Sequence, residues 1–199
     1  MSIALKFPYG LGAAGLRMTA RQFFSIGETE DRYELIDGVL VMSPSASFRH
    51  QEVLRLLLRQ IESAVDRLPG VRIVLDTDIA FSANTVYRPD IALYVAGRIQ
   101  GVPDRLAAVP DLAIEIVSPS SRPRDLQTKR DDYARFGVRE YWVIDPPPLG
   151  DSVVRVFRLP ARAGKGKLRS PKYADLTVTR GGLDSVAVPG LKIDLAKLR

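Results

Sequence analysis

The sequence has no cysteine, one histidine and no long apolar run, and each absence removes a class of protein. Without cysteine there is no disulfide framework, no cysteine nucleophile and no thiolate metal site. With His50 as the only histidine, a zinc site built from several histidines cannot form. Because about 18 uncharged apolar residues never follow one another, neither a membrane span nor a signal peptide is expected. We therefore expect a cytoplasmic protein that does not enter a membrane.

The length and the composition predict one folded domain, residues 1–199. Of the 199 residues, 46% are apolar and 26% are charged, which is ordinary for a soluble globular domain. Within this domain we expect a flexible N-terminal segment at 1–18, a catalytic core at 47–145 and a basic C-terminal β extension at 151–199.

Positive charge is concentrated in the last quarter of the chain. The formal net charge is 29 − 23 = +6, and residues 151–199 alone hold 11 basic and 4 acidic side chains. The stretch 158–172 contains no acid, and its predicted loop carries the basic residues Arg162, Lys165, Lys167 and Arg169. This loop could contact the phosphate backbone of nucleic acid, or it could only keep the protein soluble. The sequence leaves both explanations open.

Hydrophobic periodicity and turn signals predict a mixed α/β fold with an α-β-β-β-α-β order from Ser47 onward. A capped helix through Phe24 and a hairpin turning at Asp37-Gly38 are expected first. The core elements expected after the hairpin are a helix at Ser47–Leu68, strands at Val71–Phe81, Val86–Val95 and Leu112–Val117, a helix at Arg122–Phe136 and a strand at Glu140–Ile144. Two further strands, Val153–Leu159 and Ala174–Thr179, and a short C-terminal helix complete the prediction.

Two carboxylates lie in or next to the predicted core strands. Asp90 leads the second strand, and Glu115 lies inside the otherwise apolar third strand. Burying an unpaired carboxylate is costly, so Glu115 needs a partner. The partner could be an arginine, with Arg88 a candidate close to Asp90, or a second carboxylate with a divalent cation between the two.

Lysine is scarce in the core, which makes Lys129 informative. The chain has 22 arginines and 7 lysines, and Lys129 is the only lysine between residues 7 and 164. Leu126, Lys129, Tyr133 and Phe136 recur at helical spacing, which predicts a lysine that reaches toward the sheet. The alternative is a surface pair of Lys129 with Asp125, four residues earlier.

These motifs together resemble the Uma-two family of endonucleases, which belongs to the PD-(D/E)xK nuclease superfamily. The resemblance covers roughly residues 19–190 and is carried by YELIDG at 33–38, His50 at the start of a long helix, RPD at 88–90, DLAIEIVSPS at 111–120, and Tyr133 followed by GVREYWVID at 137–145. It implies a restriction-endonuclease-like αβββαβ core, in which helices flank a mixed sheet, with an N-terminal hairpin and a C-terminal β extension added.

The resemblance also implies a metal site. Asp90 and Glu115 would be ligands of Mg²⁺ or Mn²⁺, and the backbone carbonyl of Ile116 would complete the protein's share of the ligands. The family's lysine normally stands two residues after the second acid, where this chain has Val117. In some members the following helix supplies the lysine, and Lys129 is placed to do so.

Two more residues stand at family positions: Glu34 resembles an additional acid of the site, and His50 stands where family members often carry a histidine. Gln127, one helical face away from Lys129, is a weaker candidate. The sequence leaves the roles of His50 and Gln127 open.

We therefore expect a magnesium-dependent endonuclease that acts on DNA as a homodimer, with catalytic residues Asp90, Glu115, Lys129 and Glu34. Metal-bound water attacking in line suits the slow hydrolysis of phosphodiesters. An alternative is an inactive nucleic-acid-binding or interaction module on a decayed nuclease fold, which Val117 would favour. A third possibility is a two-carboxylate hydrolase of another substrate. A glycosidase, for example, would need Tyr94 or Trp142 as an aromatic platform for the sugar.

Overall fold

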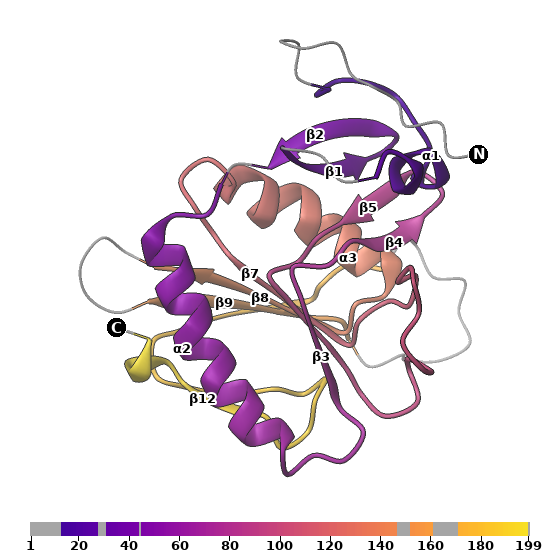
Figure 1. Cartoon of the computed structure of the whole chain (residues 1–199). Coiled ribbons are helices and arrows are strands. Elements are labelled where there is room, and N and C mark those ends of the chain that lie inside the picture. Colours follow the sequence, from indigo (N-terminus) through magenta and orange to yellow (C-terminus); the bar gives the residue numbers. More distant parts are fainter. Residues whose placement is uncertain (1–12, 28–30, 44, 147–151, 161–170, 199) are drawn as a thin grey trace. The chain divides into compact units, whose positions relative to one another are not determined.

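The computed structural model describes residues 13–27, 31–43, 45–146, 152–160 and 171–198 (Figure 1). The chain forms two compact units. The first comprises Met1–Ser45, Thr77–Arg88 and Pro103–Ala108, and the second comprises Ala46–Asp76, Pro89–Val102 and Val109–Arg199. The expectation of one domain over the whole chain stays a prediction.

The first unit contains one short helix and a four-stranded sheet. Helix α1, Ala20–Ser25, begins at Thr19, whose side chain forms the expected capping box with Gln22. The sheet has the order β2-β1-β5-β4, with β1 at Arg32–Ile36, β2 at Val39–Ser43, β4 at Ile79–Ser82 and β5 at Thr85–Tyr87. Asp37 and Gly38 both have positive φ, as a tight hairpin turn requires, so the predicted hairpin is confirmed.

The second unit is built on a six-stranded mixed sheet with the order β10-β9-β8-β7-β6-β3. Only β7 and β8 pair in parallel, and the other neighbours are antiparallel. The strands are β3 at Arg72–Leu75, β6 at Ile91–Tyr94, β7 at Leu112–Ile116, β8 at Glu140–Asp145, β9 at Val153–Arg158 and β10 at Asp175–Thr179. A separate hairpin pairs β11, Gly182–Asp184, with β12, Lys192–Asp194.

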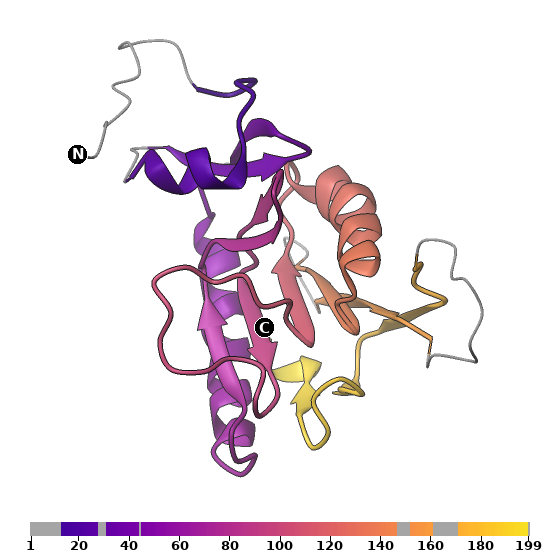
Figure 2. The ribbon, with the colours of Figure 1, turned by 90° about the vertical axis from the view of Figure 1, so that its right-hand side faces the viewer.

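Helices cover both faces of this sheet. Helix α2, Phe48–Val65, is capped by Ser47, and helix α3 spans Arg130–Phe136. Figure 2 shows α2 and α3 on opposite sides of the sheet. The elements α2, β3, β6, β7, α3 and β8 give the expected αβββαβ order. Among the residues that the structure describes, no helix combines the length and the apolar character needed to cross a bilayer.

Two strands predicted as continuous are each divided between two sheets. The run Val71–Phe81 forms β3 and β4, because the chain turns at Asp76, which has a φ of 43°. The run Val86–Val95 forms β5 and β6, because it is interrupted around Pro89, which cannot donate a ladder hydrogen bond. In both cases the two halves lie in different units.

The predicted helix Arg122–Phe136 also differs in detail. It begins with a π-helical segment, η1 at Arg124–Lys129, and continues as α3 until Gly137 ends it in the left-handed conformation. The short C-terminal helix is the 3-10 segment η2, Leu195–Lys197, and the hairpin before it was not predicted. Arg162, Lys165, Lys167 and Arg169 lie outside the described residues.

A buried carboxylate anchors the C-terminal segment to the sheet. Glu140 at the start of β8 is fully buried, and Arg158 donates to its Oε1 at 3.0 Å. Its Oε2 accepts from the Ser185 hydroxyl and from the backbone N–H groups of Val186 and Ala187 at 2.6–3.0 Å. This carboxylate therefore has a structural role, since its hydrogen bonds hold the segment that follows β11.

Candidate metal and catalytic site

The register of the sheet brings Asp90 beside Glu115. In the antiparallel pair of β6 and β7, Ile91 lies opposite Ile114. One more step of this register, at the end where β6 begins, puts Asp90 opposite Glu115. The side chain of Asp90 then takes the place of a ladder partner, since its Oδ2 accepts from the backbone N–H of Ile116 at 2.6 Å.

Asp90 is held from two further directions. Nε2 of His50, in the first turn of α2, lies 3.2 Å from the same Oδ2. The backbone carbonyl of Asp90 accepts from the N–H of Asp76 at 3.2 Å. The Asp90 side chain is 20% exposed, so the carboxylate is fixed by hydrogen bonds but still reaches solvent.

The side chain of Glu115, on β7 opposite Asp90, lies in a buried polar cluster. Its Oε1 accepts from Nζ of Lys129 and from the hydroxyl of Tyr133, each at 2.9 Å. The side chains of Glu115 and Lys129 are only 6% and 5% exposed. Oδ1 of Asp125 lies 3.7 Å from the same Nζ. Glu115 thus has the partner that its burial requires.

The π-helical segment positions these donors. Lys129 is its last residue, and Tyr133 follows one turn later on α3. Both are buried, as the stripe through Lys129 and Tyr133 predicts, whereas Gln127 is exposed. The pair of Asp125 and Lys129 considered as the alternative does form, but both side chains are buried, so it does not lie at the surface. Single π-helical turns inside helices often mark functional sites.

Arg88 is not the partner of Asp90. Its guanidinium forms a bidentate ion pair with Asp78, with both N–O distances at 2.8 Å, inside the first unit. Its backbone N–H donates to Oε1 of Glu34 at 3.1 Å. Glu34 is therefore a buried acid of the first unit, and its expected part in catalysis stays a prediction.

His50 is a titratable group with an unusual environment. Burial lowers its pKa, but the hydrogen bond that it donates to Asp90 and the charges of Asp90, Asp76 and Asp125 outweigh that effect, so the pKa is raised. Its Nδ1 is buried and has no hydrogen-bond partner among the described residues. His50 therefore acts on Asp90 through Nε2 alone.

The donor set fits a hard divalent cation. Carboxylate and carbonyl oxygens are the ligands that Mg²⁺ prefers, usually with several waters retained. Three carboxylates (Asp90, Glu115 and Asp125) and one ammonium (Lys129) give these four side chains a formal net charge of −2. Within the described ranges, no cluster of three or more His, Asp or Glu side chains could hold a metal, so backbone and water oxygens would have to complete the ligands.

The backbone of Ile116 suits that role. In a strand, the N–H and C=O of one residue point to the same side. The N–H of Val117 donates to Ile144 on β8, whereas that of Ile116 faces Asp90. The carbonyl of Ile116 accordingly points toward Asp90 as well, where the expected carbonyl ligand would be needed.

The structure excludes the sugar platforms and adds two residues to the candidate site. Tyr94 and Trp142 are fully buried, so neither offers a sugar-stacking platform. Two residues of the site, Tyr133 and Asp125, were not assigned to it from the sequence. Tyr133 could have been found, because it follows Lys129 on the same helical stripe. The spacing of Asp125 and Lys129 predicts their pair, but not that it is buried.

Fold and site together describe a nuclease-like α+β protein, and comparison with known proteins agrees. The sequence model of the Uma2 family, described as a putative restriction endonuclease, matches residues 20–196. The chain therefore belongs to the Uma2 family. Its fold is similar to the crystal structure of a putative nuclease of DUF820 from Anabaena variabilis ATCC 29413, with a TM-score of 0.71 and 22% identity over 91% of this chain and 97% of that chain. No curated protein matches the sequence.

Proposed function

We propose that this protein is a metal-dependent endonuclease that hydrolyses phosphodiester bonds of DNA. The observation that carries the proposal is the buried carboxylate of Glu115, whose Oε1 accepts hydrogen bonds from both Lys129 and Tyr133 beside the position of Asp90. Two carboxylates that differ in exposure, next to one buried ammonium, suit the hydrolysis of an anionic ester.

Each residue has a separate task in this proposal. Asp90, Glu115 and the carbonyl of Ile116 would hold Mg²⁺ or Mn²⁺. The bound cation would supply charge neutralisation and an activated water for in-line attack on phosphorus. Lys129 would orient the attacking water and offset the negative charge that develops on the phosphate oxygens. Tyr133 and His50 act as positioning residues, since each fixes one carboxylate by a hydrogen bond.

The position of Val117 favours one alternative, an inactive binding module on a decayed nuclease fold. Val117 occupies the usual lysine position and is buried, so it supplies no cation there. Against this alternative, Lys129 lies 2.9 Å from Glu115 and places an ammonium at the acid from the following helix. The buried lysine therefore makes the active enzyme the better-supported proposal.

A double-strand cut needs two such sites, which is why we propose a homodimer. The predicted contacts of Arg162, Lys165, Lys167 and Arg169 with DNA, and the cytoplasmic location, also stay predictions.

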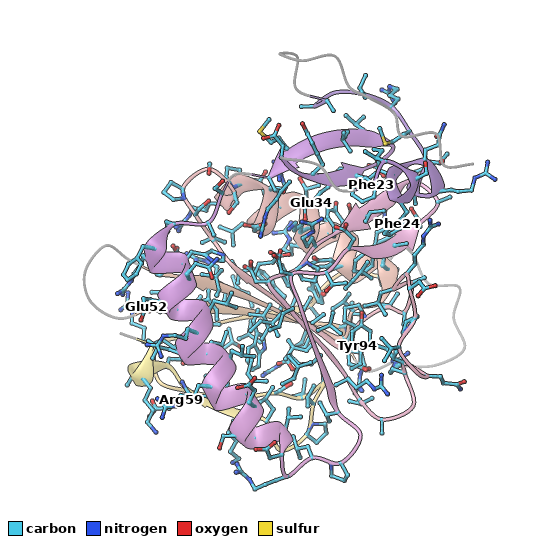
Figure 3. All side chains as sticks on the ribbon, in the orientation of Figure 1. Phe23, Phe24, Glu34, Glu52, Arg59 and Tyr94 are labelled. Atoms are coloured by element: carbon cyan, nitrogen blue, oxygen red, sulfur yellow. The ribbon has the colours of Figure 1, made fainter. Side chains whose placement is uncertain are left out.

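The proposal is tested by incubating supercoiled plasmid with the full chain in Mg²⁺, Mn²⁺ or EDTA. We expect nicking or linearisation with either metal, none in EDTA, and none with the isosteric Glu115→Gln variant. The matched control is Glu52→Gln, which changes a carboxylate on the outward side of α2 (Figure 3) and should cut like the wild type.

Lys129→Met separates the two candidate functions. Loss of cleavage with unchanged DNA binding would identify Lys129 as the displaced lysine of the site. A wild-type protein that binds DNA but cuts nothing with either metal would support the inactive module instead.

A further inference from the structure

A basic groove lies between α2 and the C-terminal segment, inside the second unit. It has a volume of about 430 Å³, and none of the described residues that line it is acidic. The lining residues are Leu56, Arg59, Gln60, Ser63, Ala64, Arg67, Lys192 and Lys197. Figure 3 shows Arg59 on the side of α2 next to the C-terminal segment. We call this feature the α2 groove.

The walls of the α2 groove are fixed by the fold. The side chain of Gln60 makes two hydrogen bonds to the backbone of Asp194, donating to its carbonyl at 3.2 Å and accepting from its N–H at 2.9 Å. Ile193, Leu195 and Leu198 are buried in the same core cluster as the inner face of α2. The C-terminal segment is therefore held against α2, and the groove exists before any ligand arrives.

The basic side chains of the groove are available to a ligand. Arg59 and Arg67 are exposed and form no ion pair with any residue in the described ranges. Lys192 and Lys197 pair with Asp184 at 3.4 Å and with Asp194 at 3.7 Å, but these ammonium-bearing side chains are 77% and 71% exposed. Exposed pairs of this kind are weak and exchange readily for a stronger anion.

Two arginines of the C-terminal quarter form ion pairs that stabilise the fold and do not line the groove. Arg155 pairs with Asp145, and Arg158 pairs with the buried Glu140, so both serve the fold. Lys192 and Lys197 instead join two arginines from a distant part of the chain. The exposed acids Glu62 and Asp66 lie on the same stretch but do not line the groove.

We propose that the α2 groove binds the phosphate backbone of duplex DNA. Single exposed charges attract a small anion weakly, whereas a polyanion that contacts several of them releases condensed counterions at each contact. Arg59 and Ser63 near the end of α2 and Arg67 in the turn after it recur every four residues, over roughly 12 Å. That length corresponds to about three phosphate steps along one strand.

The groove is separate from the metal site. His50 at the start of α2 contacts Asp90, whereas Arg59 and Arg67 of the groove follow 9 and 17 residues later, about 14–26 Å along the helix direction at 1.5 Å per residue. A duplex bound at both places would span about four to eight base pairs between His50 and these arginines. The inference rests on the proposed function only for the choice of DNA as ligand, and it does not require cleavage.

The test measures binding of the full chain to a fluorescent 24-base-pair duplex in EDTA, from 50 to 200 mM salt. Arg59→Gln/Arg67→Gln removes two phosphate contacts, so the slope of log affinity against log salt should fall in magnitude by about 1.8. The loss of affinity between the two salt concentrations then becomes about tenfold smaller than in the wild type. Asp184→Asn, which frees Lys192, should tighten binding.

The matched control is Arg55→Gln/Arg180→Gln, which removes the same charge from exposed arginines outside the groove and should leave the slope unchanged. Equal slopes for the groove variant and the control would overturn the proposal. So would binding of inorganic phosphate that needs Arg59 and Arg67 while duplex binding does not, because the groove would then be a small-anion site. Since no metal is present, failure of the proposed cleavage leaves this test unaffected.

Discussion

Replacing Lys129 by methionine tests whether the ammonium is the buried counter-charge of the site. The pair with Glu115 is 2.9 Å long, and both side chains are about 95% buried. Removing one partner of a buried ion pair typically costs about 3–5 kcal/mol, because the other charge stays buried and uncompensated. An exposed pair would cost only about 0–1 kcal/mol. We therefore expect Lys129→Met to lower the free energy of unfolding by about 3–5 kcal/mol at neutral pH.

The partner variant should behave differently, which makes the prediction sharper. In Glu115→Gln, Lys129 keeps Asp125 at 3.7 Å, and the amide oxygen can still accept from Tyr133. We expect this variant to lose less stability than Lys129→Met. The double variant Lys129→Met/Glu115→Gln should be more stable than Lys129→Met alone, because it no longer leaves the buried Glu115 charge without a counter-charge.

Urea unfolding in EDTA, followed by the fluorescence of Trp142, measures these differences. Trp142 is the only tryptophan and is fully buried in the second unit, so its signal reports on the sheet that carries Glu115. A loss below about 1 kcal/mol for Lys129→Met would refute the reasoning, since the pair would then behave as a solvated one. The comparison holds if the slope of the free energy of unfolding against urea concentration is the same in the variants and the wild type.

Other consequences concern the positioning residues and the C-terminal anchor. Tyr133→Phe keeps the ring but removes one hydrogen bond to Glu115, so Mn²⁺ affinity should fall about 10–100-fold, whereas the control Tyr173→Phe should not change it. Because the pKa of His50 is raised in the folded state, its stabilising contribution is complete below pH about 6.5 and is lost as pH rises through the folded pKa. His50→Asn should therefore flatten the fall in stability above that pH, measured by urea unfolding in EDTA. Glu140→Gln replaces the carboxylate that accepts four hydrogen bonds by a neutral amide, which weakens these bonds. Amide hydrogen exchange in the segment after β11 should therefore become faster.

Local signals predicted those elements that are determined locally. The Thr19 capping box, the Asp37-Gly38 turn and the apolar stripe of α2 each depend on residues a few positions apart. They form where expected because short-range hydrogen bonds and burial of one helix face suffice.

The division of strands between two sheets could not be predicted in the same way. The runs Val71–Phe81 and Val86–Val95 are rich in apolar residues on both sides of a few polar ones, and periodicity does not tell which sheet each half joins. The turn at Asp76 and the break at Pro89 decide it, and the break at Pro89 leaves Asp90 immediately before β6. Asp90 was identified by its motif, but its contacts with Ile116 and His50 depend on sheet register, which needs the tertiary structure.

Part of the site, the pairing of Glu115 with Lys129, could be predicted from the sequence. An acid inside an apolar strand requires a partner, and helical spacing aims Lys129 at the sheet, so their pairing follows from elementary energetics. The i,i+4 spacing also named Asp125 as a partner of Lys129, but it does not tell that the pair is buried beside Glu115.

Metal binding tests the central claim most directly, because the account makes Asp90 and Glu115 the ligands of one divalent cation. Mn²⁺ can be titrated into the full chain and the free ion followed by electron paramagnetic resonance. We predict one bound Mn²⁺ for each wild-type chain, which Mg²⁺ displaces, and no saturable binding at the same concentrations for Asp90→Asn or Glu115→Gln. Binding of Mn²⁺ by both variants with the wild-type affinity would contradict the account.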